Sequence, residues 1–320
     1  MPATARAPGK AMLFGEYAVL YGAPALVAAV DRYAVATAVS PAEGDLTSPF
    51  VVEAREAVVR HLEETRGIAA RIAGVRVDSS ALYAGGAGGR KLGLGSSAAV
   101  TVATLGCFGE RPPAELFALA AEAHARAQGS RGSGADLAAA IWGGVIRFVI
   151  RDDGGAPEVA TVTLSPAIEV TLVDTGEPAS TGDRLARLAM LQRNNPDRHR
   201  ELLRPLAELS AAVAAAAEAS GDVPFAAVRE WNRALGPLEE AIGLPILTPA
   251  LAAAAACAAS VGGAAKPSGA GGGDLAVCFT PVGSGARLSE ELAGRGLAAL
   301  TIGIGARGLH VVDGISLETR

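Results

Sequence analysis

The sequence predicts a large α+β protein, and three observations lead to this class. Half of the 320 residues are hydrophobic, which is enough to bury an extensive core. Short apolar runs broken by Gly and Pro alternate with longer segments of helical periodicity. Strand-like and helix-like segments stay interleaved along the chain, and no tandem repeat is present. This order indicates an α+β sandwich.

The first half of the chain is expected to begin with strands and to continue with helices. Apolar runs around turns near Gly15 and residues 22–24 predict two or more strands. The helices follow from apolar positions on one face among charges and from prolines at a helix start. The expected elements are strands within 11–40, helices at 52–66, 98–108 and 112–128, and a short helix followed by a strand up to residue 150.

The composition shifts to turn residues at 151–157, so we expect a division into domains of residues 1–155 and 156–320. The second part again mixes both kinds of element. The expected elements are strands at 158–164 and 168–174, helices within 183–218 and at 225–242 and 249–260, a strand near 275–279, a helix at 286–295, and final strands near 298–304 and 308–313.

Charge and composition favour a small-molecule ligand. The formal net charge is −5 and no run of Lys and Arg is present, which argues against nucleic-acid binding. No segment resembles a signal peptide or a confident membrane span. The three cysteines stand in apolar surroundings without a CxxC pair, as expected for reduced core residues of a cytoplasmic protein. We expect a monomer or a homodimer.

The stretch GLGSSAA, residues 93–99, is a candidate phosphate-binding loop. Glycines let the backbone wrap closely around phosphate oxygens, and the free N–H groups of a following helix favour an anion. The stretch lacks the GxxxxGK[ST] arrangement of the Walker type. Ser96 or Ser97 could merely cap a core helix. Together with the basic pair Arg90 and Lys91, phosphate binding is the better interpretation.

Three further features are ambiguous when each is taken alone. Asp136 in GSGADLAAA could be an ordinary acid in a first helical turn. Lys10 in PGKAMLFGEYAVLYG could be a solvated charge. The glycine-rich KPSGAGGGD, residues 266–274, could be a linker, but it runs directly into an apolar strand and so favours a ligand loop.

In this order, the four stretches resemble the signature motifs and the catalytic aspartate segment of the GHMP kinases. The resemblance covers nearly the whole chain. It implies a ribosomal S5-like N-terminal domain, a ferredoxin-like C-terminal domain, and ATP with Mg²⁺ in the cleft between them. It further implies Lys10 and Asp136 as catalytic residues and Ser97 as metal ligand. The residues expected at the nucleotide are Lys91, Gly93, Leu94, Gly95, Ser96, Ser97 and Ala98.

Within this family the details are most similar to phosphomevalonate kinases, which implies phosphorylation of 5-phosphomevalonate. Tyr17 stands where mevalonate kinases typically have a substrate-contacting His. However, the opening PGK and the VLYG also resemble mevalonate kinase, which remains the alternative. A non-catalytic ligand-binding relative and the diphosphomevalonate decarboxylase branch are less favoured. The former should lack Lys10 or Asp136, and the latter lacks the GEYAV stretch.

The resemblance also suggests how the site is composed. In mevalonate kinases a magnesium-binding Glu precedes the catalytic Asp, and here His124 comes nearest to that place, with Glu122 two residues earlier. An anionic acceptor needs cations, for which Arg32, Arg147, Arg184 and Arg193 are candidates, the first two ranked highest. The residues expected at the acceptor are Lys10, Tyr17, Arg32, Arg147, Ser180, Thr181, Ser268, Gly269, Ala270 and Gly271.

Overall fold

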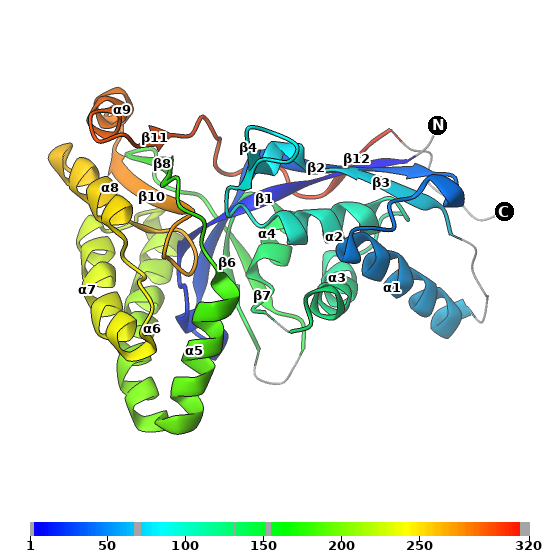
Figure 1. Ribbon diagram of the computed structural model, residues 1–320, viewed down its shortest axis with the longest axis horizontal. Coiled ribbons are helices and arrows are strands. Elements are labelled where there is room, and N and C mark those ends of the chain that lie inside the picture. Colours follow the sequence, from blue (N-terminus) through cyan, green and yellow to red (C-terminus); the bar gives the residue numbers. More distant parts are fainter. Residues whose placement is uncertain (1–2, 67–71, 131, 152–154, 314–320) are drawn as a thin grey trace.

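Two large antiparallel β-sheets organise the protein, as the computed structural model in Figure 1 shows. The structure describes residues 3–66, 72–130, 132–151 and 155–313. Each sheet has its own set of helices. The predicted α+β class is confirmed, and the helices and strands expected from sequence periodicity are present with shifted ends.

The first sheet is built around two long strands, β1 (Thr4–Phe14) and β2 (Ala25–Val39), which pair along most of their length. Both are rich in Ala and Val, and most residues of β1 and residues 25–30 of β2 are buried. The strand order is β12-β1-β2-β6-β7, with β3 on another part of β2. The additional strands are β3 (Gly74–Asp78), β6 (Val145–Val149), β7 (Glu158–Val162) and β12 (His310–Asp313).

Four helices accompany the first sheet (Figure 1). α2 is almost entirely buried, and it packs on β1, β2 and the other three helices of this group. Its central position explains why its sequence lacks an exposed polar face. A two-stranded ribbon of β4 (Tyr83–Ala84) and β5 (Arg90–Lys91) precedes it. The helices are α1 (Pro49–Arg66), α2 (Ser96–Gly106), α3 (Pro113–Gln128) and α4 (Ala135–Trp142).

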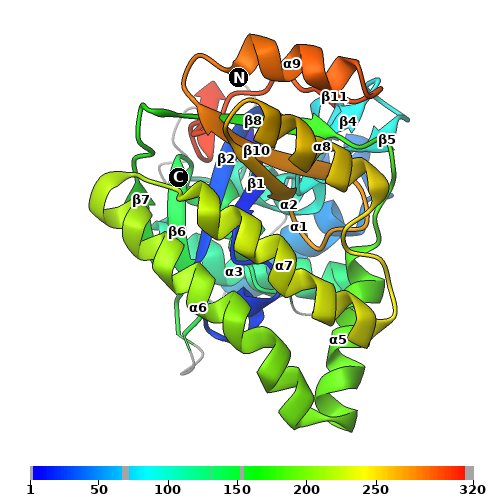
Figure 2. The same cartoon turned by 90° about the vertical axis from the view of Figure 1, so that its left-hand side faces the viewer.

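The second sheet has the order β11-β8-β10-β9, and its elements follow a βαββαβ succession. This is the predicted ferredoxin-like arrangement. Figure 2 shows α7 and α8 in front of this sheet and α9 at its upper edge. The strands are β8 (Ile168–Asp174), β9 (Ala264–Pro267), β10 (Leu275–Pro281) and β11 (Ala298–Ala299). The helices are α5 (Thr181–Asn194), α6 (Pro196–Ser220), α7 (Phe225–Ile242), α8 (Pro249–Ser260) and α9 (Gly285–Ala293).

The strand pairing places the division of the chain later than the sequence suggested. The expected boundary between residues 155 and 156 falls inside the first sheet, because β7 pairs with β6. Residues 152–154 of the predicted turn region lie outside the described residues. The sheet changes between Val162 and Ile168, and the chain returns to the first sheet when β12 pairs with β1.

The cysteines occupy the core, as predicted. Cys107, Cys257 and Cys278 are free and buried. Burial raises the pKa of the Cys107 thiol to about 11 and that of Cys278 to about 12. Within the described part of the chain, every helix is too short or too polar to span a bilayer.

Candidate active site

A cleft of about 580 Å³ lies where residues of both halves of the chain meet. Its walls come from β1, the start of α2, the segment before α4, the start of α5 and the loop between β9 and β10. Most of the residues that the sequence assigned to nucleotide, metal or acceptor line it. They are Lys10, Tyr17, Lys91, Gly93, Leu94, Gly95, Ser96, Ser97, Asp136, Thr181, Ser268, Gly269, Ala270 and Gly271.

Residues 93–99, called the first glycine loop from here on, lead directly into α2. Gly95 has a left-handed φ of 71°, and the helix begins at Ser96. The first N–H groups of a helix have no intrahelical acceptor, and none of the described residues accepts those of Ser96, Ser97 and Ala98. These N–H groups and the helix dipole make the loop a site for an anion such as phosphate.

Lys10 and Asp136 reach the first glycine loop from different elements. Lys10 projects from β1, and its Nζ donates to the carbonyl oxygen of Gly93 at 3.3 Å. Asp136 lies in the first turn of α4. A Cβ atom added to Gly95 would be 3.1 Å from Cγ of Lys10 and 3.6 Å from Cβ of Asp136. The two residues predicted to be catalytic therefore pack side by side around this glycine.

Residues 266–274, called the second glycine loop, are docked onto the first sheet by a buried ion pair. Nζ of Lys266 donates to Oε1 of Glu16 at 2.5 Å, and the exposed fractions of the two side chains are 0% and 3%. The N–H of Gly269 donates to the same oxygen at 3.2 Å. Burial lowers the pKa of Lys266, and the Glu16 carboxylate opposes this shift. The ammonium also lies 5.5 Å and 5.7 Å from the rings of Phe14 and Trp231.

Tyr17 and Ser268 strengthen the same contact. The hydroxyl of Tyr17 donates to the carbonyl oxygen of Ala270, and burial raises the pKa of this phenol. The hydroxyl of Ser268 accepts the N–H of Met12 at 3.0 Å. Both hydroxyls were predicted to bind the acceptor, yet in this structure they join the two halves of the chain.

The two glycine loops touch at Asp274. A Cβ on Gly93 would lie 2.8 Å from Cβ of Asp274, so only glycine fits there. Burial raises the pKa of Asp274, while the N–H of Ala179, which donates to its carboxylate, and nearby cations oppose the shift. Beside it, Nη2 of Arg90 donates to both carboxylate oxygens of Asp174, at 2.6 Å and 2.7 Å. This charged contact links β5 of the first half to β8 of the second sheet.

Arg32 and Arg147, the arginines ranked highest for the acceptor, lie outside the cleft lining. Arg32 donates to the carbonyl oxygen of Thr301 at 3.0 Å, in the segment that returns to the first sheet. Arg147 donates to Glu218 of α6 at 2.6 Å and lies 3.8 Å from Glu158. Alternation along a strand turns Arg147 away from its buried neighbours. The structure therefore places both arginines away from the cleft.

Ser180 and Ala98 are also placed differently from the prediction, since neither lines the cleft. Ser180 precedes α5, and its hydroxyl accepts the N–H of Asp183 at 3.3 Å as a helix cap. The side chain of Ala98 is buried in the core, which leaves only its backbone N–H at the first glycine loop. Their neighbours Thr181 and Ser97 do line the cleft.

Arg184 lies beneath the second glycine loop. Its guanidinium donates to the carbonyl oxygens of Ser180 at 3.0 Å and of Pro245 at 2.7 Å and 3.1 Å. A Cβ on Gly272 would be 1.4 Å from Nη2 of Arg184, so this position requires glycine. The arginine supports the loop from below and does not line the cleft. Arg193, the fourth candidate, is exposed on α5.

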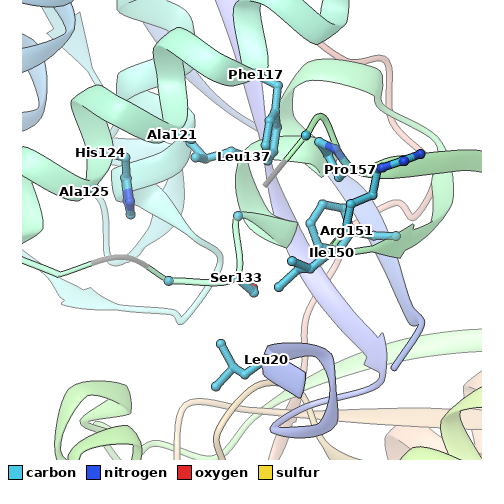
Figure 3. A pocket seen from close by; sticks show the side chains of 14 residues that line it. Leu20, Phe117, Ala121, His124, Ala125, Ser133, Leu137, Ile150, Arg151 and Pro157 are labelled. Atoms are coloured by element: carbon cyan, nitrogen blue, oxygen red, sulfur yellow. The ribbon is translucent and has the colours of Figure 1, made fainter. Parts of the chain in front are cut away.

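A second cavity of about 350 Å³ adjoins the cleft. Figure 3 shows Phe117, Ala121 and His124 projecting into it from one helix, with Leu20 on the opposite side. The cleft and this cavity share four lining residues, which are Leu20, His124, Gly132 and Ser133. The segment that carries Asp136 into α4 therefore borders both cavities.

Four ionisable residues that line the cleft were not among the predicted site residues, namely Glu16, Arg90, His124 and Asp274. Glu16 and Asp274 stand inside motifs that were recognised, so their position in the motif was an available signal. Arg90 was noted as part of a basic pair. His124 lies 3.1 Å from Ser97, measured from Nε2 to Oγ, a contact between residues 27 positions apart that no local pattern encodes.

The side chains present fit the magnesium ion that the sequence implies. Mg²⁺ in phosphotransferases is usually held by one or two protein ligands together with phosphate oxygens and water. The hydroxyl of Ser97 opens on the cleft beside the free N–H groups of α2. Within the described ranges no group of three or more His, Cys, Asp and Glu could hold a metal ion. Bound phosphates would therefore supply most of the coordination.

Comparison with known proteins agrees with this geometry. Residues 51–144 match the family model described as the GHMP kinases N-terminal domain. The phosphomevalonate kinase of Streptomyces sp. (strain CL190) is 32% identical, covering 85% of this chain and 88% of that protein. The mevalonate kinase of Archaeoglobus fulgidus is 30% identical, covering 60% of this chain and 65% of that protein. The Streptococcus pneumoniae phosphomevalonate kinase in complex with phosphomevalonate and AMPPNP superposes with a TM-score of 0.77 at 21% identity, covering 94% and 99% of the chains.

Proposed function

The chain belongs to the GHMP kinase family and is a phosphotransferase, and from this premise we propose that it transfers the γ-phosphoryl group of ATP to 5-phosphomevalonate. The product is 5-diphosphomevalonate. The observation that carries the proposal is the extent of likeness to the Streptomyces phosphomevalonate kinase, at 85% of this chain against 60% for the Archaeoglobus mevalonate kinase. The ammonium groups of Lys10 and Lys91 at the cleft support an anionic acceptor, whereas the charge of Arg90 is already paired with Asp174.

The first glycine loop is proposed to hold the nucleotide. Its free N–H groups at Ser96, Ser97 and Ala98 would bind the β- and γ-phosphates, because they lie at the positive end of α2, where Ser96 and Ser97 line the cleft. Lys10 would neutralise the transferring group, whose charge spreads over its equatorial oxygens. Ser97 would hold Mg²⁺, which when bound offsets the charge of the phosphates. The residues thus act by position and charge.

Asp136 is proposed to orient Lys10. The second pKa of a phosphate monoester is about 6, so the phosphate of the acceptor is already ionised at neutral pH and needs no general base. We expect Asp136→Asn to lose only a few-fold in kcat and to keep the KM of phosphomevalonate. Single-turnover phosphoryl transfer measures this, with thermal melting as the control for folding. A loss of several orders of magnitude in a folded variant would contradict the orienting role.

Mevalonate kinase is the second candidate function, and the opening PGK and the VLYG of the first motif favour it. Its acceptor is a hydroxyl, which must lose a proton, so Asp136 would then be a general base. An ATP-coupled assay with mevalonate and phosphomevalonate side by side decides between them. We expect kcat/KM to be at least a hundredfold higher with phosphomevalonate, and the reverse ratio would overturn the proposal.

A further inference from the structure

His124 borders both the cleft and the second cavity, and Figure 3 shows it at the second cavity. It projects from α3, and its side chain is buried. Its ring packs on that of Phe50 from α1, with the ring centroids 5.2 Å apart and the planes inclined by 30°. Packing between two helices restricts the imidazole to a narrow range of orientations. The residue therefore presents its Nε2 atom in a defined direction.

The partner of this nitrogen is the hydroxyl of Ser97, at 3.1 Å. Ser97 is the second residue of α2, beside the N–H groups left free for phosphate. A serine hydroxyl has one proton to donate and two lone pairs that accept, and a neutral imidazole accepts at one nitrogen. When Ser97 donates its proton to Nε2, both lone pairs of its oxygen remain available to a cation in the cleft.

The carboxylate nearest in sequence is engaged elsewhere. Glu122 accepts from Arg126 at 3.1 Å and lies 3.1 Å from Arg60, on a half-exposed face of α3. Among the residues that the structure describes, His124 is the one side chain within hydrogen-bond distance of Oγ of Ser97. The orientation of this hydroxyl consequently depends on His124.

We propose that His124 is a positioning residue, which accepts the hydroxyl proton of Ser97 and so turns the serine oxygen toward the metal–nucleotide complex. The inference rests on the proposed binding of ATP and a divalent cation at the first glycine loop, and it does not depend on the acceptor.

The competing role is that of a metal ligand. Two ligands about 2.1 Å from an octahedral ion lie about 3 Å apart, so the distance alone permits it. Mg²⁺ prefers oxygen, however, whereas imidazole suits softer cations, and this favours the positioning role.

Binding of Mn²⁺ in the presence of ADP tests the proposal, with free Mn²⁺ measured by electron paramagnetic resonance. We expect His124→Leu to weaken binding roughly fivefold, because one hydrogen bond that orients a ligand is lost. His124→Gln can accept the same proton through its amide oxygen and should stay within about twofold of the wild type. In a Ser97→Ala background, His124→Leu should have no further effect. The matched control is His61→Gln on α1, which should bind as the wild type does.

If His124→Leu weakens Mn²⁺ binding equally in the wild-type and the Ser97→Ala backgrounds, the proposal is overturned, since His124 would then act independently of the hydroxyl. Electron spin-echo modulation of the Mn²⁺–ADP complex provides a second test. We expect no directly coordinated ¹⁴N, and a strong nitrogen coupling that disappears in His124→Gln would make His124 a ligand instead.

These measurements need no acceptor, so they separate this inference from the proposed function. If the coupled assay shows no preference for phosphomevalonate while the variants change Mn²⁺ affinity as expected, only the assignment of the acceptor fails. In the enzyme assay, His124→Leu should raise the KM of ATP and leave the KM of the acceptor unchanged. A general loss of structure would instead change both constants and lower the melting temperature.

Discussion

The two glycine loops look alike in sequence and differ in what they do in the structure. The first leaves the N–H groups of Ser96, Ser97 and Ala98 without a partner among the described residues. The second is held by bonds from the first sheet, including the N–H of Gly269 and the side chain of Lys266, which both donate to Glu16. Both loops line the cleft, but the first keeps these N–H groups free there, while the second uses polar groups to join the two halves of the chain.

Glycine is required in both loops, for different physical reasons. Gly95 takes a left-handed φ so that the chain can turn into α2 beside Lys10. Gly272 leaves room for the guanidinium of Arg184 against the backbone. Glycine-rich composition therefore indicates close approach to the backbone, and the approaching group can be a ligand or the protein itself.

The largest effect is expected from a substitution in the second glycine loop, which should lower the stability of the fold. Lys266→Met leaves the Glu16 carboxylate buried without its ion-pair partner, which should lower the free energy of unfolding by about 3–5 kcal/mol. Denaturation by urea measures this. The double variant Glu16→Gln/Lys266→Met removes both charges and should recover most of the loss. If the single variant costs less than about 1 kcal/mol, the pair does not dock the loop.

The second largest effect is expected from a substitution in the first glycine loop, which should lower kcat/KM. Gly95→Ala places a methyl group 3.1 Å from Cγ of Lys10 and should displace the predicted catalytic lysine, with a loss of about a hundredfold in kcat/KM. Gly86→Ala is the matched control, because Gly86 also has a positive φ but nothing within 4 Å of the added Cβ. Its kcat/KM should stay within about twofold. Equal losses in both variants would assign the effect to backbone strain.

The smallest effect is expected away from both loops. Arg147 pairs with Glu218 and Glu158 at the surface of the sheet, and exposed ion pairs contribute about 0–1 kcal/mol to the free energy of unfolding. Because Arg147 also lies outside the cleft, Arg147→Ala should keep the KM of the acceptor within about twofold, as steady-state kinetics can measure. A tenfold rise in the KM of the acceptor would instead show that the charge of Arg147 contributes to acceptor binding from outside the cleft.

Local patterns predicted the elements well because the periods of helices and strands are properties of neighbouring residues. The helix at 112–128, for instance, is α3 (Pro113–Gln128). The domain boundary was missed because the pairing of β7 with β6 and of β12 with β1 depends on which strands become neighbours. Arg32 and Arg147 were ranked highly because they flank apolar runs, yet a flanking position does not say which side of a sheet a residue faces.

The sequence by itself determined the α+β class, the family, and the set of motifs that carry Lys10, Ser97 and Asp136, since these follow from residue types, spacing and order. Only the tertiary structure decided which glycine loop keeps free N–H groups at the cleft and which one is tied to the first half of the chain. The deciding contact is the ion pair between Glu16 and Lys266, which are 250 positions apart in the sequence. Its energy depends on the burial of both charged groups away from water, and only the packing of the two halves of the chain produces this burial.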